Sequence, residues 1–184
     1  MLTKKCRICR KPNRPYKNTC SIECEAELGL KLLDKRKRVE AKNVRAIDKV
    51  RAEKLKSRSD WMREAQQAFN RYIRARDENQ PCICCGRTET KVTGLGAHGW
   101  DSGHYRSVGS APHLRFNENN AHRQLVYCNR YGAGRAVDYR LGLIERIGLQ
   151  AVEELESNND VMKWTIDDLK QIKELYKRKL KDMK

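Results

Sequence analysis

Apolar residues recur at helical spacing in the stretch that follows residue 58. They lie three or four positions apart on one face, and this set consists of Trp61, Ala65, Ala68, Phe69, Tyr72 and Ile73. Ser59 is the expected N-cap, because a serine hydroxyl can accept a hydrogen bond from an amide of the first turn. Pro81 ends the pattern, since proline cannot donate a backbone hydrogen bond inside a helix. We therefore predict a helix that begins after Ser59 and packs its apolar face into a core.

Two more helices are expected nearer the C-terminus. The first has an apolar face that consists of Tyr139, Leu143, Ile144 and Ile147. Gly148 follows as a natural stop, because glycine readily adopts the left-handed conformation that ends many helices. The second begins at Thr165, which forms a capping-box pattern with Asp168 three residues later. Its apolar face continues through Leu169, Ile172, Tyr176 and Leu180. Both segments should therefore be amphipathic helices with one buried face.

Residues 31–58 are rich in helix-forming residues but lack a broad apolar face. They contain twelve Lys and Arg against four Asp and Glu, which gives this stretch a net charge of +8. One interpretation is a solvated spacer, and the other is a helix that follows DNA phosphates. The expected phosphate contacts in the second case are Lys35, Arg36, Lys37 and Arg38. A dimeric coiled coil is disfavoured, because neither heptad register keeps apolar residues at both core positions.

The charge of the whole chain indicates a polyanionic partner. Lys and Arg number 40 against 24 Asp and Glu among 184 residues, which leaves a formal net charge of +16. A solvated basic surface explains part of this excess, but the rest favours a nucleic acid as the partner. No run approaches 18 apolar residues, and the N-terminus lacks the apolar stretch of a secretory signal. We therefore expect a cytoplasmic protein without a membrane partner.

Four of the eight cysteines lie within the first 24 residues, in two short pairs. Two residues separate Cys6 from Cys9, and three separate Cys20 from Cys24. Two such turns about ten residues apart can bring four thiolates to the corners of a tetrahedron, as structural zinc requires. Because 24 residues cannot bury a hydrophobic core, a metal would supply the folding free energy of this segment. Unrelated cysteines or a redox-active pair are the alternatives to zinc.

A second group of chemically active residue types lies in a stretch with little periodicity. It consists of Cys82, Cys85, Asp101, His104, Asn117, Asn120, His122, Gln124, Cys128 and Asn129. An imidazole can take a proton from water, and a divalent ion with oxygen and nitrogen ligands can stabilise charge on a phosphate. This set of residue types therefore suits a metal-dependent nuclease.

At these residues the chain resembles the His-Asn-His (ββα-metal) endonucleases, and in particular the lambdoid phage NinG (Rap) recombination endonucleases. The matching features begin with the four-cysteine segment and the basic helix. The others are Ser-x5-Ala-Gln-Gln-Ala at 59–68, Pro-Cys-x2-Cys-Gly at 81–86, Trp-Asp-x-Gly-His-Tyr-Arg at 100–106, Leu-Arg-Phe-Asn-Glu-x-Asn at 114–120 and Trp-Thr-Ile at 164–166. The resemblance covers essentially the whole chain and is more specific than a His-Asn-His pattern by itself.

The resemblance implies a structure-selective endonuclease that cuts branched recombination intermediates such as Holliday junctions with Mg²⁺ or Mn²⁺. His104 would be the general base, and Asn120 would position it or shape the adjoining loop. Asn129 would ligate the catalytic metal, with Asp101 as the candidate for a second ligand. His122 would bind phosphate or metal, the alternative being an ordinary packed histidine.

The same resemblance bears on partners. Junction cleavage requires two coordinated nicks, so a homodimer on branched double-stranded DNA is the economical expectation. Arg106 and Arg115 are expected DNA contacts in addition to the basic helix. A phage-encoded protein of this kind would act in the cytoplasm of the host cell. The competing function is a zinc-finger accessory protein that binds nucleic acid without cleaving it.

The chain departs from the family at a second zinc site. The family has another Cys-x2-Cys pair at the helix start, but Leu125 replaces its first cysteine. The remaining candidate ligands are Cys82, Cys85 and Cys128. We expect His98 to complete the site, because Cys84 neighbours Cys85 and would be poorly placed in the same tetrahedron. Alternatively the zinc is absent, and the reduced cysteines simply pack.

These patterns together predict a mainly α protein with small zinc-bound elements. The expected order is a four-cysteine zinc finger over residues 1–24, a basic helical linker over 25–58 and a nuclease domain over 59–184. The nuclease domain should consist of a ββα-metal core with flanking helices. The expected cofactors are structural Zn²⁺ and catalytic Mg²⁺ or Mn²⁺.

Overall fold

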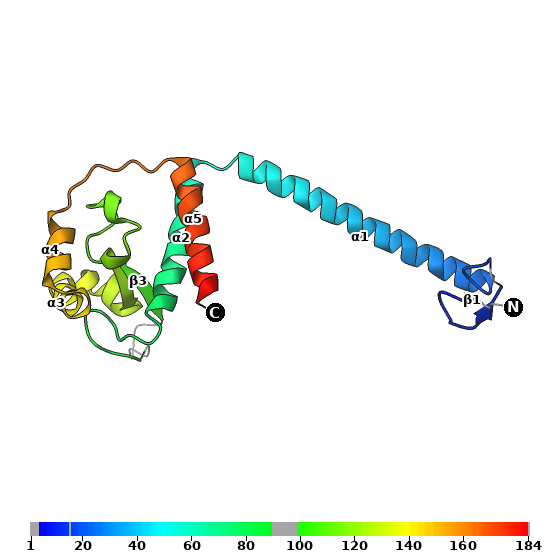
Figure 1. Ribbon diagram of the computed structural model, residues 1–184, viewed down its shortest axis with the longest axis horizontal. Helices are drawn as coiled ribbons and strands as arrows, with labels where there is room; N and C mark the ends of the chain where they lie inside the picture. Colours follow the sequence, from blue (N-terminus) through cyan, green and yellow to red (C-terminus); the bar gives the residue numbers. More distant parts are fainter. Residues whose placement is uncertain (1–3, 15, 90–98, 184) are drawn as a thin grey trace. The chain divides into compact units, whose positions relative to one another are not determined.

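The computed structural model describes residues 4–14, 16–89 and 99–183 (Figure 1). The chain forms two compact units, Met1–Lys56 and Ser57–Lys184, and each is described by itself. The fold is mostly helical with two small antiparallel sheets. No helix in the described ranges is long and apolar enough to cross a membrane.

The N-terminal unit consists of a small hairpin and one long helix. Strand β1 (Lys4–Lys5) pairs antiparallel with β2 (Pro12–Asn13), and α1 (Ile22–Lys54) follows. Ser21 caps α1, because its hydroxyl accepts a hydrogen bond from the amide of Cys24. The structure describes all of α1, and none of its residues is buried. A continuous helix in the basic segment is thus confirmed, but it ends at Lys54 and not at the predicted residue 58. Its stability comes from local propensity rather than from a packed face.

Helices α2 (Arg58–Arg76) and α5 (Ile166–Asp182) pack side by side in the second unit (Figure 1). The N-cap of α2 is Ser57, so the expectation of Ser59 was wrong by two residues. Asp60 explains the difference, because its carboxylate accepts a hydrogen bond from the amide of Ser57 and completes a capping box. The capping box predicted at Thr165 in α5 is confirmed.

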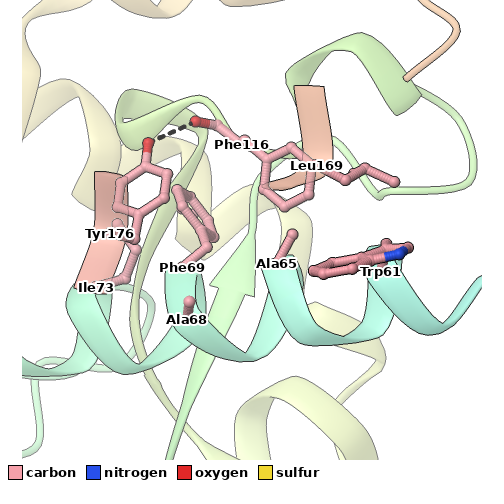
Figure 2. Close-up of a cluster of buried hydrophobic side chains, with 9 residues drawn as sticks. Trp61, Ala65, Ala68, Phe69, Ile73, Phe116, Leu169 and Tyr176 are labelled. Atoms are coloured by element: carbon pink, nitrogen blue, oxygen red, sulfur yellow. Dashed lines mark hydrogen bonds between the residues drawn. The ribbon is translucent and has the colours of Figure 1, made fainter. Parts of the chain in front are cut away.

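The core between α2 and α5 uses the predicted apolar faces (Figure 2). Its buried residues are Trp61, Ala65, Ala68, Phe69, Ile73, Phe116, Ala121, Leu169 and Tyr176. The ring of Phe69 meets the rings of Phe116 and Tyr176 edge to face. The hydroxyl of Tyr176 donates to the carbonyl of Phe116 at 3.0 Å. This last bond attaches α5 to the loop that follows strand β3.

A two-stranded sheet lies at the centre of the second unit. Strand β3 (Trp100–His104) pairs antiparallel with β4 (Ala121–Leu125), with His104 opposite Ala121. Tyr139 spans both strands, because its hydroxyl donates to the carbonyl of Gly103 and accepts from the amide of His122. A Cβ on Gly103 would lie 2.0 Å from Oε1 of Gln124, so this strand position requires glycine. Helix α2 packs on one face of the sheet through Phe69, and Tyr139 packs on the other.

Short turns and two helices complete the second unit. The turns are η1 (Pro112–Leu114), η2 (Glu118–Asn120), the π-helical η3 (Tyr127–Tyr131) and η4 (Ala133–Arg135). Helix α3 (Ala136–Ile147) is the predicted one and ends at Gly148. Helix α4 (Leu149–Ser157), which the sequence pattern did not indicate, follows at once and buries Val152 and Leu155. Its apolar face is too short to be recognised without the partner surface on α3.

Candidate functional site

The N-terminal cysteines form a cluster with the dimensions of a zinc site. The Sγ atoms of Cys6, Cys9, Cys20 and Cys24 all lie within 4.8 Å of one another. The Cys9–Cys20 and Cys20–Cys24 sulfur distances are 3.3 and 3.8 Å. Four thiolates around one zinc at about 2.3 Å stand about 3.8 Å apart, so the cluster fits the metal closely. The prediction that these four residues could hold zinc agrees with the structure.

The backbone around this cluster is arranged to hold it. The amide of Cys6 donates to the carbonyl of Lys11, and Arg10 adopts a positive φ of 65° where the chain turns between Cys9 and β2. The side-chain amide of Asn13 donates to the carbonyls of Lys17 and Thr19. Although desolvation raises it, hydrogen bonds from the amides of Cys9, Ile8 and Cys20 lower the pKa of the Cys6 thiol to about 6. A thiolate is therefore favoured at Cys6, as metal binding requires.

The second cysteine cluster contains four thiols rather than three. The Sγ atoms of Cys82, Cys84, Cys85 and Cys128 all lie within 4.8 Å of one another. The Cys82–Cys84 sulfur distance is 3.5 Å, and the Cys85–Cys128 sulfur distance is 3.6 Å. The expectation that Cys84 would be poorly placed is therefore wrong. His98, the ligand expected from the sequence, lies outside the described residues.

A tight turn explains how adjacent cysteines reach the same point. The amide of Gly86 donates to the carbonyl of Cys82, and Gly86 has a positive φ of 68°. Within this turn the side chains of Cys84 and Cys85 converge instead of pointing to opposite sides as in a strand. Leu125 packs its side chain against Cys82 and Cys128, so it contributes apolar contact at the position where the family resemblance implied a cysteine.

Hydrogen bonds to sulfur further stabilise the second cluster. The amide of Leu125 donates to Sγ of Cys82 at 3.3 Å, and Nε2 of Gln124 donates to Sγ of Cys84 at 3.4 Å. Hydrogen bonding by the Cys84 thiol and the amide of Leu125 lowers the pKa of Cys82 to about 4. Such bonds are typical second-sphere contacts of thiolate metal sites. The cluster could therefore hold a metal such as zinc.

We expect the purified protein to contain two zinc ions per chain, and the C84S variant to contain one. Removal of one thiolate from a four-sulfur site should eliminate tight binding, because zinc in structural sites requires four protein ligands. Elemental analysis after dialysis against a mild chelator provides the measurement. The H98A variant is the control and should retain both ions. One ion in H98A together with two in C84S would make His98 the ligand and contradict the assignment of Cys84.

The structure brings Asp101 and Asn129 together. Asp101 lies in β3 and Asn129 in η3, and Nδ2 of Asn129 donates to Oδ2 of Asp101 at 2.9 Å. Arg130 also contacts this carboxylate, with Nε at 2.8 Å from Oδ2 and Nη2 at 2.9 Å from Oδ1. Partial burial raises the pKa of Asp101, but the hydrogen bonds from Arg130 and Asn129 hold it below its usual range. The carboxylate is therefore ionised at neutral pH and is 18% exposed in its side chain.

His104 lies on the other face of β3. Side chains alternate along a strand, so residues 101 and 104 point to opposite sides of the sheet. The imidazole of His104 stands 5.9 Å from the ring of Phe69, and its Nε2 donates to the carbonyl of Arg115 at 3.0 Å. Burial lowers the pKa of His104, and hydrogen bonding to the Arg115 carbonyl offsets part of this effect. The ring is neutral at pH 7, but it is not beside the Asp101–Asn129 pair.

Asn120 holds the loop that follows His104. It is fully buried, and its Oδ1 accepts from the amide of Arg106 at 2.8 Å. Its Nδ2 donates to the carbonyls of Arg106 and Leu114. A side chain with both a donor and an acceptor can satisfy this set of backbone groups, which accounts for asparagine at the position.

Two residues predicted to contact substrate, His122 and Arg106, form hydrogen bonds within the fold. His122 is 3% exposed, and its Nδ1 accepts from Arg76 while its Nε2 donates to the carbonyl of Asn119. Both ring nitrogens are therefore occupied, and burial lowers the pKa of His122. Arg106 donates to the carbonyls of Leu155 and Glu156 in the last turn of α4 and to that of Asn158, the C-cap of the helix. Arg106 thus holds the end of α4 in place. The DNA contact predicted for Arg106 and the phosphate or metal contact predicted for His122 stay predictions.

Arg115 is half-buried, and one of its guanidinium nitrogens lacks a partner. Its Nη1 donates to Oε1 of Gln66, whereas its buried Nε has no hydrogen-bond acceptor among the described residues. Burial lowers the pKa of Arg115, and the positive charge of Arg58 adds to this effect. An anion would satisfy both features, so this residue stays a candidate phosphate contact.

The four consecutive cations predicted to bind DNA, Lys35, Arg36, Lys37 and Arg38, are all exposed in α1.

Two charged residues that no sequence pattern indicated, Arg130 and Asp77, shape these surroundings. Arg130 forms an ion pair with Asp101, and Asp77 is the C-cap residue of α2. Asp77 is 4% exposed and contacts Arg76, His122 and Arg146. Neither residue belongs to a motif, so no local pattern could have indicated it.

Comparison with known proteins finds relatives that match nearly the whole chain. The family model described as Bacteriophage Lambda NinG protein matches residues 1–184. Protein ninG of Escherichia phage lambda is 43% identical over 176 residues, covering 90% of this chain and 83% of that protein. Protein ninG of Salmonella phage P22 is 42% identical over 176 residues with the same coverage of 90% and 83%. Protein ninG of Enterobacteria phage H19B is 41% identical over 195 residues, covering 98% of this chain and 94% of that protein. No solved structure matches the chain.

Proposed function

The chain belongs to the bacteriophage lambda NinG family, and from this premise we propose that it is a metal-dependent endonuclease for branched DNA. Its substrates are recombination intermediates such as Holliday junctions. The proposal rests first on one observation, the contact between the carboxylate of Asp101 and the side chain of Asn129. A net charge of +16 supplies the electrostatic attraction that a DNA substrate requires.

The Asp101–Asn129 pair has the chemistry of a site for Mg²⁺ or Mn²⁺. These ions prefer oxygen ligands, and a carboxylate with an amide oxygen leaves positions for water and for phosphate oxygens. Rotation of the Asn129 amide by half a turn would present its oxygen instead of its nitrogen. The bound ion would stabilise the charge that develops on the scissile phosphate.

The second cysteine cluster holds this pair in place. Asn129 directly follows Cys128 in η3, and Asp101 lies in the strand whose partner, β4, ends at Leu125 beside Cys82. A zinc ion at the cluster would therefore restrain both elements that carry the pair. Arg130, whose side chain is 64% exposed, would release the carboxylate and move to a phosphate oxygen when DNA binds.

His104 is the proposed general base. Burial keeps its ring neutral at pH 7, and a neutral imidazole can accept a proton from water. The side chains of His104 and Asp101 lie on opposite faces of β3. The scissile phosphate would therefore have to bind at the end of the strand, where it could approach both side chains. Asn120 supports this arrangement by holding the loop after His104.

Two variants of His104 test its role. Both H104A and H104Q should cut junctions about 10²–10⁴-fold more slowly than the wild type, since neither side chain can serve as a base. Glutamine can still donate a hydrogen bond to the Arg115 carbonyl, so H104Q preserves a purely structural contact. Recovery of the wild-type rate in H104Q would show that His104 only positions the loop.

The activity itself is tested on a labelled four-way junction in Mg²⁺, next to duplex and single-stranded DNA of the same sequence. We expect paired nicks in the junction, and because two strands must be cut, the protein should act as a homodimer. EDTA should stop cleavage while junction binding persists. Binding without cleavage in both Mg²⁺ and Mn²⁺ would favour the competing function, a zinc-finger accessory protein of recombination.

A further inference from the structure

Six cations form one continuous line along α1. They occupy positions separated alternately by four and three residues, namely Lys31, Lys35, Arg38, Lys42, Arg45 and Lys49. At about 100° per residue, all six side chains fall within about 40° of a common line along the helix. Every position of this sector between Lys31 and Lys49 is basic. We name this set the cationic stripe.

The acidic residues of the same stretch lie elsewhere on the helix. Asp34, Glu40 and Asp48 are rotated by at least about 60° from the centre of the stripe. Lys31 pairs with Glu27 and Arg38 with Asp34, both at 2.8 Å on an exposed surface. Exposed pairs of this kind contribute little free energy and separate readily. In the described part of the chain the other four cations of the stripe form no ion pair, so α1 neutralises its row of like charges only in part.

The stripe has the length and charge density to match a nucleic acid backbone. Lys31 and Lys49 are 18 positions apart, which corresponds to about 27 Å along the helix at 1.5 Å per residue. The same length of DNA duplex carries about 16 phosphates, at one charge per about 1.7 Å of axis. A row of amines and guanidiniums can thus face several phosphates at once, and no residue of α1 is buried against its own unit.

We propose that the cationic stripe binds the phosphate backbone of duplex DNA without regard to sequence. The choice of duplex DNA, rather than another polyanion, rests on the proposed function. The four consecutive cations Lys35, Arg36, Lys37 and Arg38 lie on two different faces of α1. Lys35 and Arg38 belong to the stripe, whereas Arg36 and Lys37 point about 140° and 120° away from its centre.

Two triple variants with the same change in charge test the proposal. The stripe variant replaces Lys35, Lys42 and Arg45 with glutamine, and the matched control replaces Lys37, Lys54 and Arg36 with glutamine. Each removes two lysines and one arginine from α1, and in the described part of the chain none of the six forms an ion pair. Glutamine has nearly the helix propensity of lysine and arginine, so α1 should persist, which circular dichroism can verify.

The measurement is the salt dependence of binding to a labelled duplex, in EDTA so that no strand is cut. The slope of log K against log salt concentration should flatten by about 2.7 in the stripe variant, at about 0.9 per lost phosphate contact. The control should flatten it by less than about 1. Equal flattening of the slope in both variants would show that only the net charge of α1 matters. An unchanged slope in both variants would show that α1 is a spacer that does not contact DNA. Either result overturns the proposal.

The same measurement distinguishes binding of duplex DNA from DNA cleavage and from binding of other polyanions. Because cleavage does not enter the measurement, a protein that never cuts DNA can still show the difference between the two variants. Vesicles with anionic lipids and single-stranded RNA serve as competing polyanions at equal salt. Preferential binding of the stripe to either of them over duplex DNA would contradict the proposal.

Discussion

Replacement of Asp101 by asparagine should lower the rate of junction cleavage about 10³-fold. The carboxylate is the charged member of the Asp101–Asn129 pair, and it is held ionised by Arg130 and Asn129. A catalytic metal contributes several kcal/mol to stabilisation of the transition state, and each 1.36 kcal/mol corresponds to a factor of ten. Asparagine retains the shape of the side chain, so the expected loss comes from charge rather than from packing.

Single-turnover cleavage in Mg²⁺, together with junction binding in EDTA, provides the measurement. The D101N variant should bind the junction as well as the wild type or slightly better, since a negative charge near DNA is removed. D167N is the matched control, because Asp167 also pairs with a cation, Lys170, on an exposed surface. A D101N variant that cuts at the rate of the control would show that Asp101 has no part in the reaction.

Replacement of Asp77 by alanine should destabilise the second unit by about 3–5 kcal/mol. Its carboxylate is buried and forms ion pairs or hydrogen bonds with Arg76, His122 and the amide of Arg123. Arg146 lies 3.7 Å from the same carboxylate. Removal of one partner from a buried charge network leaves the others uncompensated, which is the costly case for buried ion pairs. Urea unfolding of the two proteins gives the free-energy difference directly.

Asp77 should also make the stability of the second unit depend on pH. Burial raises the pKa of Asp77, but the contact with His122 and the hydrogen bonds from Arg76 and the amide of Arg123 outweigh it and hold the pKa well below the usual range. A depressed pKa in the folded state contributes stability above the unfolded-state pKa of about 3.9. This contribution is lost as the pH falls below about 4 toward the folded-state pKa. The D77A variant should therefore lose less stability than the wild type over that acidic range.

Two further variants make the result interpretable. D77N keeps an acceptor for the amide of Arg123 and should lie between the wild type and D77A. D167A removes an exposed carboxylate and should change stability by less than about 0.5 kcal/mol. A D77A protein as stable as D167A would contradict the assignment of Asp77 as the centre of the network.

The helices and their caps could be predicted because their determinants are local. The apolar residues Trp61, Phe69 and Ile73 repeat at the helical period, and Thr165 and Asp168 stand at capping-box spacing. The error at Ser59 is also local, since Ser57 and Ser59 precede the same helix and Asp60 at the third position selects Ser57. Helix α4 was missed because its burial depends on α3, which its own nine residues do not reveal.

The candidate site was predictable in its residue types but not in its arrangement. Cysteine spacing indicated that Cys6, Cys9, Cys20 and Cys24 would come together where they could hold a metal, because all four lie within one short segment. Spacing misled at Cys84, since a tight turn at Gly86 brings neighbouring cysteines to one point. The contact between Asp101 and Asn129 joins residues 28 positions apart, and it agrees with the ligand pair that the family resemblance implied.

By itself, the sequence determined what short-range physics controls: the helical periods, the caps, the thiol pairs and the row of cations on α1. The tertiary structure alone decided which polar groups are available to a substrate. His122 and Arg106 have the chemistry of phosphate ligands, yet one is enclosed by Arg76 and Asn119 and the other caps α4. A buried polar group must find partners, and those partners come from segments far away in the chain. Local pattern therefore indicates which side chains can bind, and packing determines which of them remain free to do so.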